Sequence, residues 1–187
     1  MIDAVLDACV LYSALLRDFL LRLAANKLFG PLWSEEIQNE WIRSLLRKRS
    51  GLKHEKLERT RREMDSYFPE SLVRGYESIT PTLMLPDPND RHVLAVAIYT
   101  KAKYIVTFNL DDFPDSVLAP HQVKAISPDE FVLRIVELDS EHFIETVAKH
   151  RAVLSRPVLS VAEYLATLEK QGLSKTVAFL RNHVGDL

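Results

Sequence analysis

The chain has 187 residues, of which 47% are hydrophobic and 27% are charged, and its formal net charge is −2. This composition is typical of a folded globular protein, and the near-neutral charge excludes a global attraction to nucleic acid. A single cysteine, Cys9, excludes an internal disulfide, and no segment resembles a membrane span or a signal peptide, so a cytoplasmic location is expected.

The first two thirds of the chain alternate strand-like and helix-like segments. Short apolar or β-branched runs predict strands at Ile2–Leu6, Pro31–Trp33, Tyr104–Phe108 and His121–Ile126. Apolar residues at helical spacing, together with capping residues, predict helices over 15–24, 34–49, 54–67 and 88–102, with an irregular or extended stretch over 72–85. This alternation predicts an α/β fold with a short, mostly parallel sheet and helices on both faces.

The pattern changes at Ser127, after which no further strand is expected. The run Ser127-Pro128-Asp129-Glu130 resembles a capping box and opens a helix. Three more helices are expected over 140–154, 160–171 and 174–183. The sequence therefore predicts two domains, an α/β domain over 1–127 and an all-helical C-terminal subdomain over 128–187.

Basic residues gather in one segment, 43–62. It holds nine Lys or Arg against two Glu, a formal +7, which leaves −9 for the rest of the chain. Such asymmetry indicates an anionic partner or, more commonly, a solvated helical face. The choice depends on whether an acidic site lies nearby.

The run Asp87-Pro88-Asn89-Asp90-Arg91-His92 precedes an apolar helix. Asp87 reads as the N-cap, Pro88 as the first helical residue and Asp90 as a carboxylate of the first turn. One interpretation is that both acids only cap the helix. The alternative is that one of them faces a cation.

Other acids follow the predicted strands. Asp7 follows the first strand, and Asn109, Asp111 and Asp112 follow the Tyr104–Phe108 strand. Parallel sheets bind ligands beyond the carboxyl ends of their strands, so a shared site is expected there. Glu40 lies on the flank of the apolar stripe of its helix, from which it can turn inward. Singly, Asp7 is equally well read as a loop acid or an N-cap, Glu40 alone is more often a surface residue, and Asp111 and Asp112 can be turn residues before Pro114.

Jointly, the acids predict a metal site. Several carboxylates in one place repel each other unless a cation holds them, and hard oxygen ligands select Mg²⁺ or Mn²⁺. Such a metal suits phosphodiester hydrolysis, and the basic segment would then bind the polyanionic backbone. Thr107 is a candidate for orienting a ligand, although a threonine at a strand end is more often structural.

These segments resemble a PIN-domain nuclease of the VapC type, the toxins of toxin–antitoxin pairs. The resemblance covers roughly residues 1–130, and the helical tail is similar to that of a longer VapC-like subgroup. The matching segments are residues 5–11, 34–40, 87–92 with Ala95 and Ala97, and 105–113. Cys9 stands where the family often has Asn, which removes a polar contact, and Asn109 stands where it often has Asp.

The resemblance implies a three-layer α/β/α sandwich and a Mg²⁺- or Mn²⁺-dependent endoribonuclease. It implies a cognate antitoxin as partner, a homodimer and RNA as substrate. The expected catalytic and metal-binding residues are Asp7, Glu40, Asp90 and Asp112. Supporting residues are Thr107, Asn109 and Asp111, with Asp111 as the alternative last ligand. The expected contacts to the RNA backbone are Arg43, Arg47, Lys48 and Arg49.

Two other functions remain open on the sequence. One is a PIN nuclease of RNA processing or of structured DNA, outside toxin–antitoxin systems. The other is a catalytically silent PIN-like interaction module. A dinucleotide or P-loop enzyme is excluded because no glycine-rich fingerprint is present, and one cysteine with six scattered histidines disfavours zinc.

Overall fold

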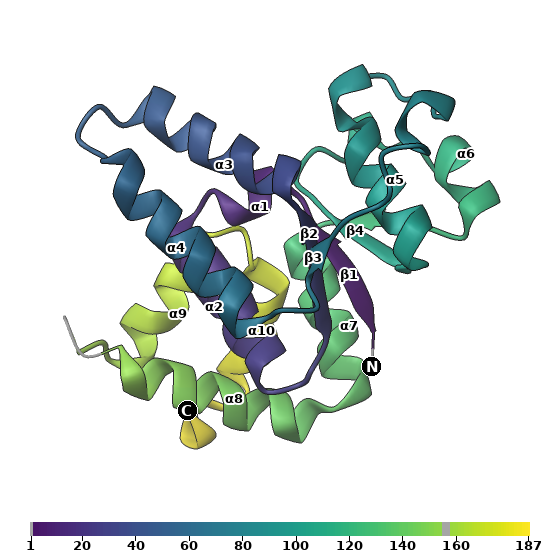
Figure 1. Ribbon diagram of the computed structural model, residues 1–187. Helices are drawn as coiled ribbons and strands as arrows, with labels where there is room; N and C mark the ends of the chain where they lie inside the picture. Colours follow the sequence, from purple (N-terminus) through teal and green to yellow (C-terminus); the bar gives the residue numbers. More distant parts are fainter. Residues whose placement is uncertain (1, 155–157) are drawn as a thin grey trace. The chain divides into compact units, whose positions relative to one another are not determined.

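The computed structural model describes residues 2–154 and 158–187 (Figure 1). By contacts the described chain divides into two units, and the division does not follow the chain order. One unit contains residues 2–12 and 30–126, which hold the sheet. The other contains residues 13–29 together with the segment from Ser127 onward, and it is helical. The helix near the N-terminus thus packs with the C-terminal helices.

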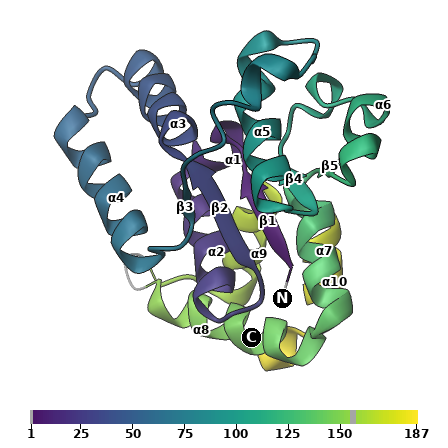
Figure 2. The same cartoon turned by 45° about the vertical axis from the view of Figure 1, so that its right-hand side comes forward.

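The sheet unit is built on five parallel strands in the order β3-β2-β1-β4-β5, which Figure 2 shows from left to right. The strands are β1 (Asp3–Leu6), β2 (Gly30–Ser34), β3 (Leu72–Val73), β4 (Tyr104–Val106) and β5 (Lys124–Ile126). β1 and β4 are central and buried, in keeping with their apolar sequences. Because the chain moves outward from β1 to β3 and then returns to β4, the order reverses between β1 and β4.

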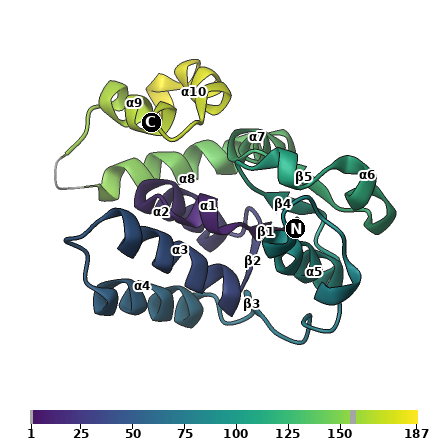
Figure 3. The same ribbon diagram turned by 90° about the horizontal axis from the view of Figure 1, so that it is seen from above.

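Helices of the same unit connect these strands, and Figure 1 and Figure 3 show α3 and α4 side by side. Ser34 caps α3 by accepting a hydrogen bond from the Ile37 N–H, and α5 packs on β1, β2 and β4. The helices are α1 (Ala8–Leu11), α3 (Glu35–Lys48), α4 (His54–Tyr67), α5 (Arg91–Thr100) and α6 (Asp115–Leu118). The 3₁₀ turns are η1 (Thr80–Thr82), η2 (Pro88–Asp90), η3 (Leu110–Asp112) and η4 (Ala119–His121).

The helical unit joins α2 (Ala14–Ala25) to the C-terminal helices. They are α7 (Pro128–Leu138), α8 (Ser140–Val153), α9 (Val161–Glu169) and α10 (Ser174–Arg181), followed by the 3₁₀ turn η5 (Val184–Asp186). α2 packs on α8, and α10 packs on α7 and α9. Figure 3 shows α10 beside α9. Buried His150 of α8 bonds to the Asp18 carboxylate of α2 at 2.9 Å and to the Tyr164 hydroxyl of α9 at 2.8 Å. This chain of hydrogen bonds ties three helices together.

Most predicted elements are confirmed, and two details are wrong. Pro88 does not begin the long helix, because Pro88–Asp90 forms a 3₁₀ turn and α5 starts at Arg91. Phe108 is not buried in a strand, since β4 ends at Val106 and the Phe108 side chain is 46% exposed. The predicted C-terminal helices are all present. The domain boundary after residue 127 stays a prediction, and α2 groups with the residues beyond it.

None of the helices within residues 2–154 and 158–187 is long and apolar enough to cross a membrane.

Candidate active site

Asp7 lies at the carboxyl end of β1, where the strand order reverses. Its N–H donates to the Val106 carbonyl of β4 at 3.1 Å, so the residues that follow the two strands are adjacent. The Thr107 hydroxyl donates to Asp7 Oδ2 at 2.7 Å, and the Ala8 N–H donates to Oδ1 at 2.6 Å. Both carboxylate oxygens are therefore held in place at the edge where ligands bind in such sheets.

Cys9 belongs to this site and not to the core. Its Sγ donates to Asp7 Oδ2 at 3.1 Å, accepts from the Phe108 N–H at 3.3 Å and lies 3.4 Å from the Thr107 hydroxyl. Burial and the charge of Asp7 raise the pKa of the thiol to about 12. The expected loss of a polar contact at this position is wrong, because the thiol supplies one to Asp7.

Glu40 faces the same site from the second turn of α3, and its partner is His92. The Glu40 Oε1 lies 3.1 Å from His92 Nε2, and the Glu36 carboxylate lies 3.8 Å from Nδ1. Burial lowers the pKa of His92, but the hydrogen bond to Glu40 and the charges of Glu40, Glu36 and Asp7 outweigh it and raise the pKa. The hydrogen bond between the His92 ring and the carboxylate thus orients Glu40.

Asp90 lies at the N-terminus of α5, at the same edge of the sheet. Burial raises its pKa from 3.8 to about 7, and the charges of Asp7, Asp87, Asp112 and Glu40 add to the shift. Burial is the larger cause of the raised pKa, and repulsion among the neighbouring carboxylates adds to it. The helix α5, which leads to β4, therefore has Asp90 at its N-terminus, near Asp7 at the end of β1 and Glu40 on α3.

These groups line one cavity of about 810 Å³ in the sheet unit. One wall carries carboxylates, and α3 supplies acids from its first half and bases from its second. The lining residues are Asp7, Ala8, Cys9, Tyr12, Glu36, Glu40, Arg43, Ser44, Arg47, Lys48, Asp87, Asn89, Asp90 and Asn109. Acids that could bind a metal and bases that could bind phosphates thus share one hollow.

The remaining candidates lie differently. Asp112 is partly exposed and does not line the cavity, although its charge acts on Asp90. Asp111 is exposed, and neither the cavity nor the shift of Asp90 involves it. Arg49 is also exposed outside the lining, whereas Arg43, Arg47 and Lys48 lie within it.

The donor set fits Mg²⁺ or Mn²⁺ in kind, because carboxylate and amide oxygens converge and the pKa of Asp90 is raised. In the part of the chain that the structure describes, no three His, Cys, Asp or Glu side chains are arranged closely enough to hold an ion. Protein groups engage two of the acids: the Thr107 hydroxyl bonds to Asp7, and the His92 ring bonds to Glu40.

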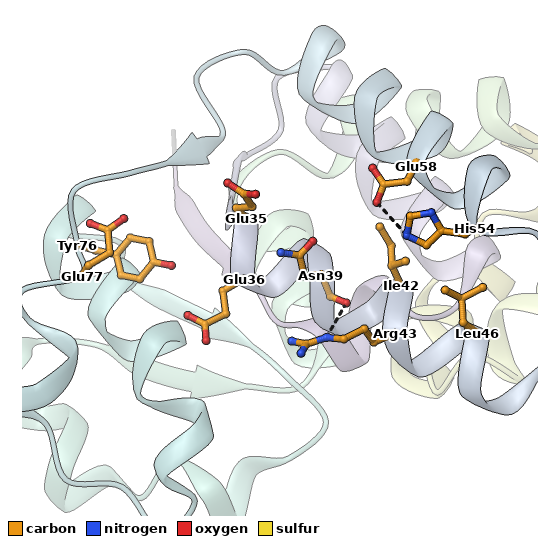
Figure 4. A pocket seen from close by; sticks show the side chains of 10 residues that line it. All are labelled: Glu35, Glu36, Asn39, Ile42, Arg43, Leu46, His54, Glu58, Tyr76 and Glu77. Atoms are coloured by element: carbon orange, nitrogen blue, oxygen red, sulfur yellow. Dashed lines mark hydrogen bonds and ion pairs between the residues drawn. The ribbon is translucent and has the colours of Figure 1, made fainter.

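A second cavity of about 570 Å³ adjoins the first along α3, and Figure 4 shows its lining. Glu36 and Arg43 line both cavities. In Figure 4 the Arg43 Nε donates to the Asn39 carbonyl, and His54 pairs with Glu58 of α4. Arg43 is thus partly engaged within its own helix, while Arg47 and Lys48 lie farther along α3.

Sequence reasoning gave no role to several residues of the site. His92 lies in the run that precedes the apolar helix and has no predicted role, yet its ring bonds to Glu40. Glu36 lies one turn before Glu40, and this i,i+4 spacing was the available signal. Asp87 caps the 3₁₀ turn through the Asn89 N–H, as expected, and it also lines the cavity.

Two family models and one curated relative match parts of the chain. The model of the PIN domain matches residues 3–111, and that of the VapC50 C-terminal domain matches residues 128–182. A curated Mycobacterium tuberculosis (strain ATCC 25618 / H37Rv) protein named "Putative ribonuclease VapC50" is 52% identical over 52 residues. That stretch covers 28% of this chain and 31% of the relative, so less than a third of the relative is matched. No solved structure matches the chain.

These matches confirm the predicted VapC-like resemblance. With the all-parallel five-stranded sheet, they also confirm the predicted fold class, an α/β/α sandwich of PIN type with a helical C-terminal segment. Since the PIN-domain model covers more than half of its residues, the chain belongs to the PIN-domain family.

Proposed function

We propose that the chain is a divalent-metal-dependent endoribonuclease and the toxin of a toxin–antitoxin pair. The observation that carries the proposal is the convergence of Asp7, Glu40 and Asp90 on one cavity, where neighbouring carboxylates, Asp112 included, help to raise the pKa of Asp90 to about 7. A hard cation stabilises such a site. The PIN-domain match and the name of the VapC50 relative support ribonuclease activity.

In this proposal Asp7, Glu40, Asp90 and Asp112 hold Mg²⁺ or Mn²⁺, with Asn109 assisting. A metal bound there would activate water, neutralise the phosphate and stabilise the leaving oxygen. The side chains need fixed positions for this chemistry, and hydrogen bonds provide them for two of the four acids.

The chain's own groups supply orientation and substrate binding. Thr107 and Cys9 hold Asp7, and His92 holds Glu40. The cationic side chains of Arg47 and Lys48 line the same cavity and would bind RNA phosphates beside the acids. A phosphodiester bound by Arg47 and Lys48 would lie next to the carboxylates.

The partners follow from the same proposal. A cognate antitoxin would block the site, and two copies of the chain would form a homodimer in the cytoplasm, where RNA is the substrate. These statements rest on the VapC-like resemblance.

The test is incubation of total cellular RNA with the protein and Mn²⁺, followed by mapping of new RNA ends. New ends are expected with the wild type and with Asp115→Asn, an exposed aspartate on α6 that does not line the cavity. None are expected with Asp7→Asn or Asp90→Asn, provided that both variants keep the wild-type circular dichroism spectrum. Cleavage that persists in both variants, or its absence with the wild type, contradicts the proposal.

A further inference from the structure

Tyr12 is an aromatic side chain in the wall of the acidic cavity. It follows the short helix α1 and lies five residues after Asp7, and its side chain is partly exposed. It lines the same hollow as Asp7, Glu40 and Asp90. Neither metal binding by the acids nor phosphate binding by the Lys and Arg side chains requires an aromatic ring. The position of Tyr12 in this cavity therefore needs a separate explanation.

The Tyr12 ring is paired with a cation from α3. The Lys48 ammonium lies 5.4 Å from the ring centroid, within the range of a cation–π contact. Lys48 also lines the cavity, together with Arg47 and Ser44 of the same helix. The cavity lining therefore includes an aromatic ring and a positive charge next to each other.

The pair lies a short way along α3 from the acids. Lys48 follows Glu40 by eight residues, which corresponds to about 12 Å along the helix axis. A few nucleotides of an extended strand span such a distance. A strand whose reacting phosphate lay at the acids would thus bring a neighbouring nucleotide to Tyr12 and Lys48.

We propose that Tyr12 and Lys48 form a subsite for one unpaired nucleotide of the substrate, with its base stacked on the Tyr12 ring and its phosphate paired with the Lys48 ammonium. The two groups match the two parts of a nucleotide, a flat base and an anion. Bases inside a duplex have both faces covered by their neighbours, so only a single-stranded or splayed base can stack on the ring. The subsite therefore takes an unpaired nucleotide, and this assignment rests on the proposed function.

A purely structural role for the pair makes a different prediction. In that case Lys48 and Tyr12 only hold the end of α3 near α1, and loss of the ring would change stability without changing base stacking. The chain offers a matched control, because Lys103 lies 5.6 Å over the ring of Tyr104 in a second cation–π pair that does not line the cavity.

The experiment measures base stacking directly. The probes are short single-stranded oligoribonucleotides of mixed sequence, each with 2-aminopurine at a different position, mixed with metal-free protein so that no cleavage occurs. Stacking quenches 2-aminopurine fluorescence. The variants are Tyr12→Leu, Tyr12→Phe, Lys48→Met and the control Lys103→Met, each compared with the wild type for quenching, affinity and melting temperature.

Quenching at one or two positions is expected with the wild type, Tyr12→Phe and Lys103→Met. Tyr12→Leu should lose the quenching and bind roughly 5- to 150-fold more weakly, the usual effect of losing one stacked base. Lys48→Met should keep some quenching but bind more weakly, with a smaller dependence on salt. The same oligonucleotide annealed to its complement should compete poorly.

Equal quenching and affinity in Tyr12→Leu, or equal competition by the duplex, would overturn the subsite. Cleavage of total RNA with Mn²⁺ separates this failure from that of the proposed function. Wild-type cleavage with an unaltered Tyr12→Leu binding profile removes the subsite alone. A wild type that cleaves no RNA removes the proposed function as well.

Discussion

The Thr107 hydroxyl donates a 2.7 Å hydrogen bond to the Asp7 carboxylate, although 100 residues separate the two in the sequence. Parallel pairing of β1 with β4 brings them together, because each residue directly follows its strand. The same hydroxyl oxygen accepts a 3.0 Å hydrogen bond from the Asn109 N–H. One buried hydroxyl thus fixes both a candidate metal ligand and the start of the loop that leads to Asp112.

Thr107→Val should weaken Mn²⁺ binding and cleavage by roughly 10- to 100-fold, because it keeps the shape of the side chain but removes the donor to Asp7. Thr107→Ser retains the hydroxyl and should stay within a few-fold of the wild type. Mn²⁺ affinity and single-turnover cleavage are the two measurements. Equal loss in both variants would show that packing of the methyl group, and not the hydrogen bond, is responsible.

Asp90→Asn should stabilise the metal-free protein at neutral pH. The raised pKa means that between pH 4 and 7 folded Asp90 holds a proton that the unfolded chain releases, so stability falls as pH rises through this window. The full shift would be worth roughly 4 kcal/mol, and because Asp90 is partly exposed, solvent screening leaves roughly 1–2 kcal/mol.

Urea denaturation of metal-free Asp90→Asn and wild type from pH 5 to 8 measures this difference. The two free energies of unfolding should diverge as pH rises, with the variant more stable at pH 7. Asp111→Asn is the control, since exposed Asp111 does not contribute to the shift of Asp90. Parallel pH profiles for Asp90→Asn and wild type would refute the electrostatic coupling.

Neutralising Arg47, Lys48 and Arg49 to Gln should weaken RNA binding and reduce its salt dependence. Loss of three phosphate contacts would lower the slope of log K against log salt by about 2 for a single strand. The matched control is Arg59→Gln with Arg62→Gln on α4, which lie outside the acidic cavity. A similar drop in slope for both variants would indicate that the whole hairpin attracts RNA without a defined track.

Asp18→Asn should destabilise the protein at neutral pH by roughly 1 kcal/mol. The hydrogen bond from His150 lowers the pKa of Asp18 below 3.8. The ionised Asp18 carboxylate therefore contributes its full stabilisation above about pH 4, and this stabilisation is lost as pH falls through the lowered pKa. The difference between variant and wild type in chemical denaturation should accordingly close at acid pH.

Glu137→Gln serves as the control for Asp18→Asn, because Glu137 belongs to an exposed ion pair with Arg134 on α7. Exposed pairs of this kind contribute little. If Asp18→Asn has no larger effect than this control at pH 7, the Asp18–His150 bond does not stabilise the helical unit.

Local signals in the sequence predicted the secondary structure well. The helix over 54–67 begins and ends as expected, because its charge pattern and the Pro69 that follows it are local features. The turn at Pro88–Asp90 was missed, since a proline near a helix start is compatible with both an α-helix and a 3₁₀ turn. The packing of α2 with the C-terminal helix α8 depends on tertiary contacts, which local sequence patterns do not predict.

The parts of the candidate site that depend on sheet topology could be predicted from the sequence. Strand ends placed Asp7 beside the residues after β4, and the reversal of strand order does the same in the structure. His92 was missed because its partner Glu40 lies 52 residues away. The polar role of Cys9 was missed because an apolar run hides a side chain that turns to the sheet edge.

Titration of metal-free protein with Mn²⁺, followed by electron paramagnetic resonance of the free ion, tests the shared metal site most directly. Saturable binding is predicted for the wild type and for Asp115→Asn. Asp7→Asn, Glu40→Gln, Asp90→Asn and Asp112→Asn should each bind at least about tenfold more weakly. Affinities equal to that of the wild type in Asp7→Asn and Asp90→Asn would contradict a metal held by these acids.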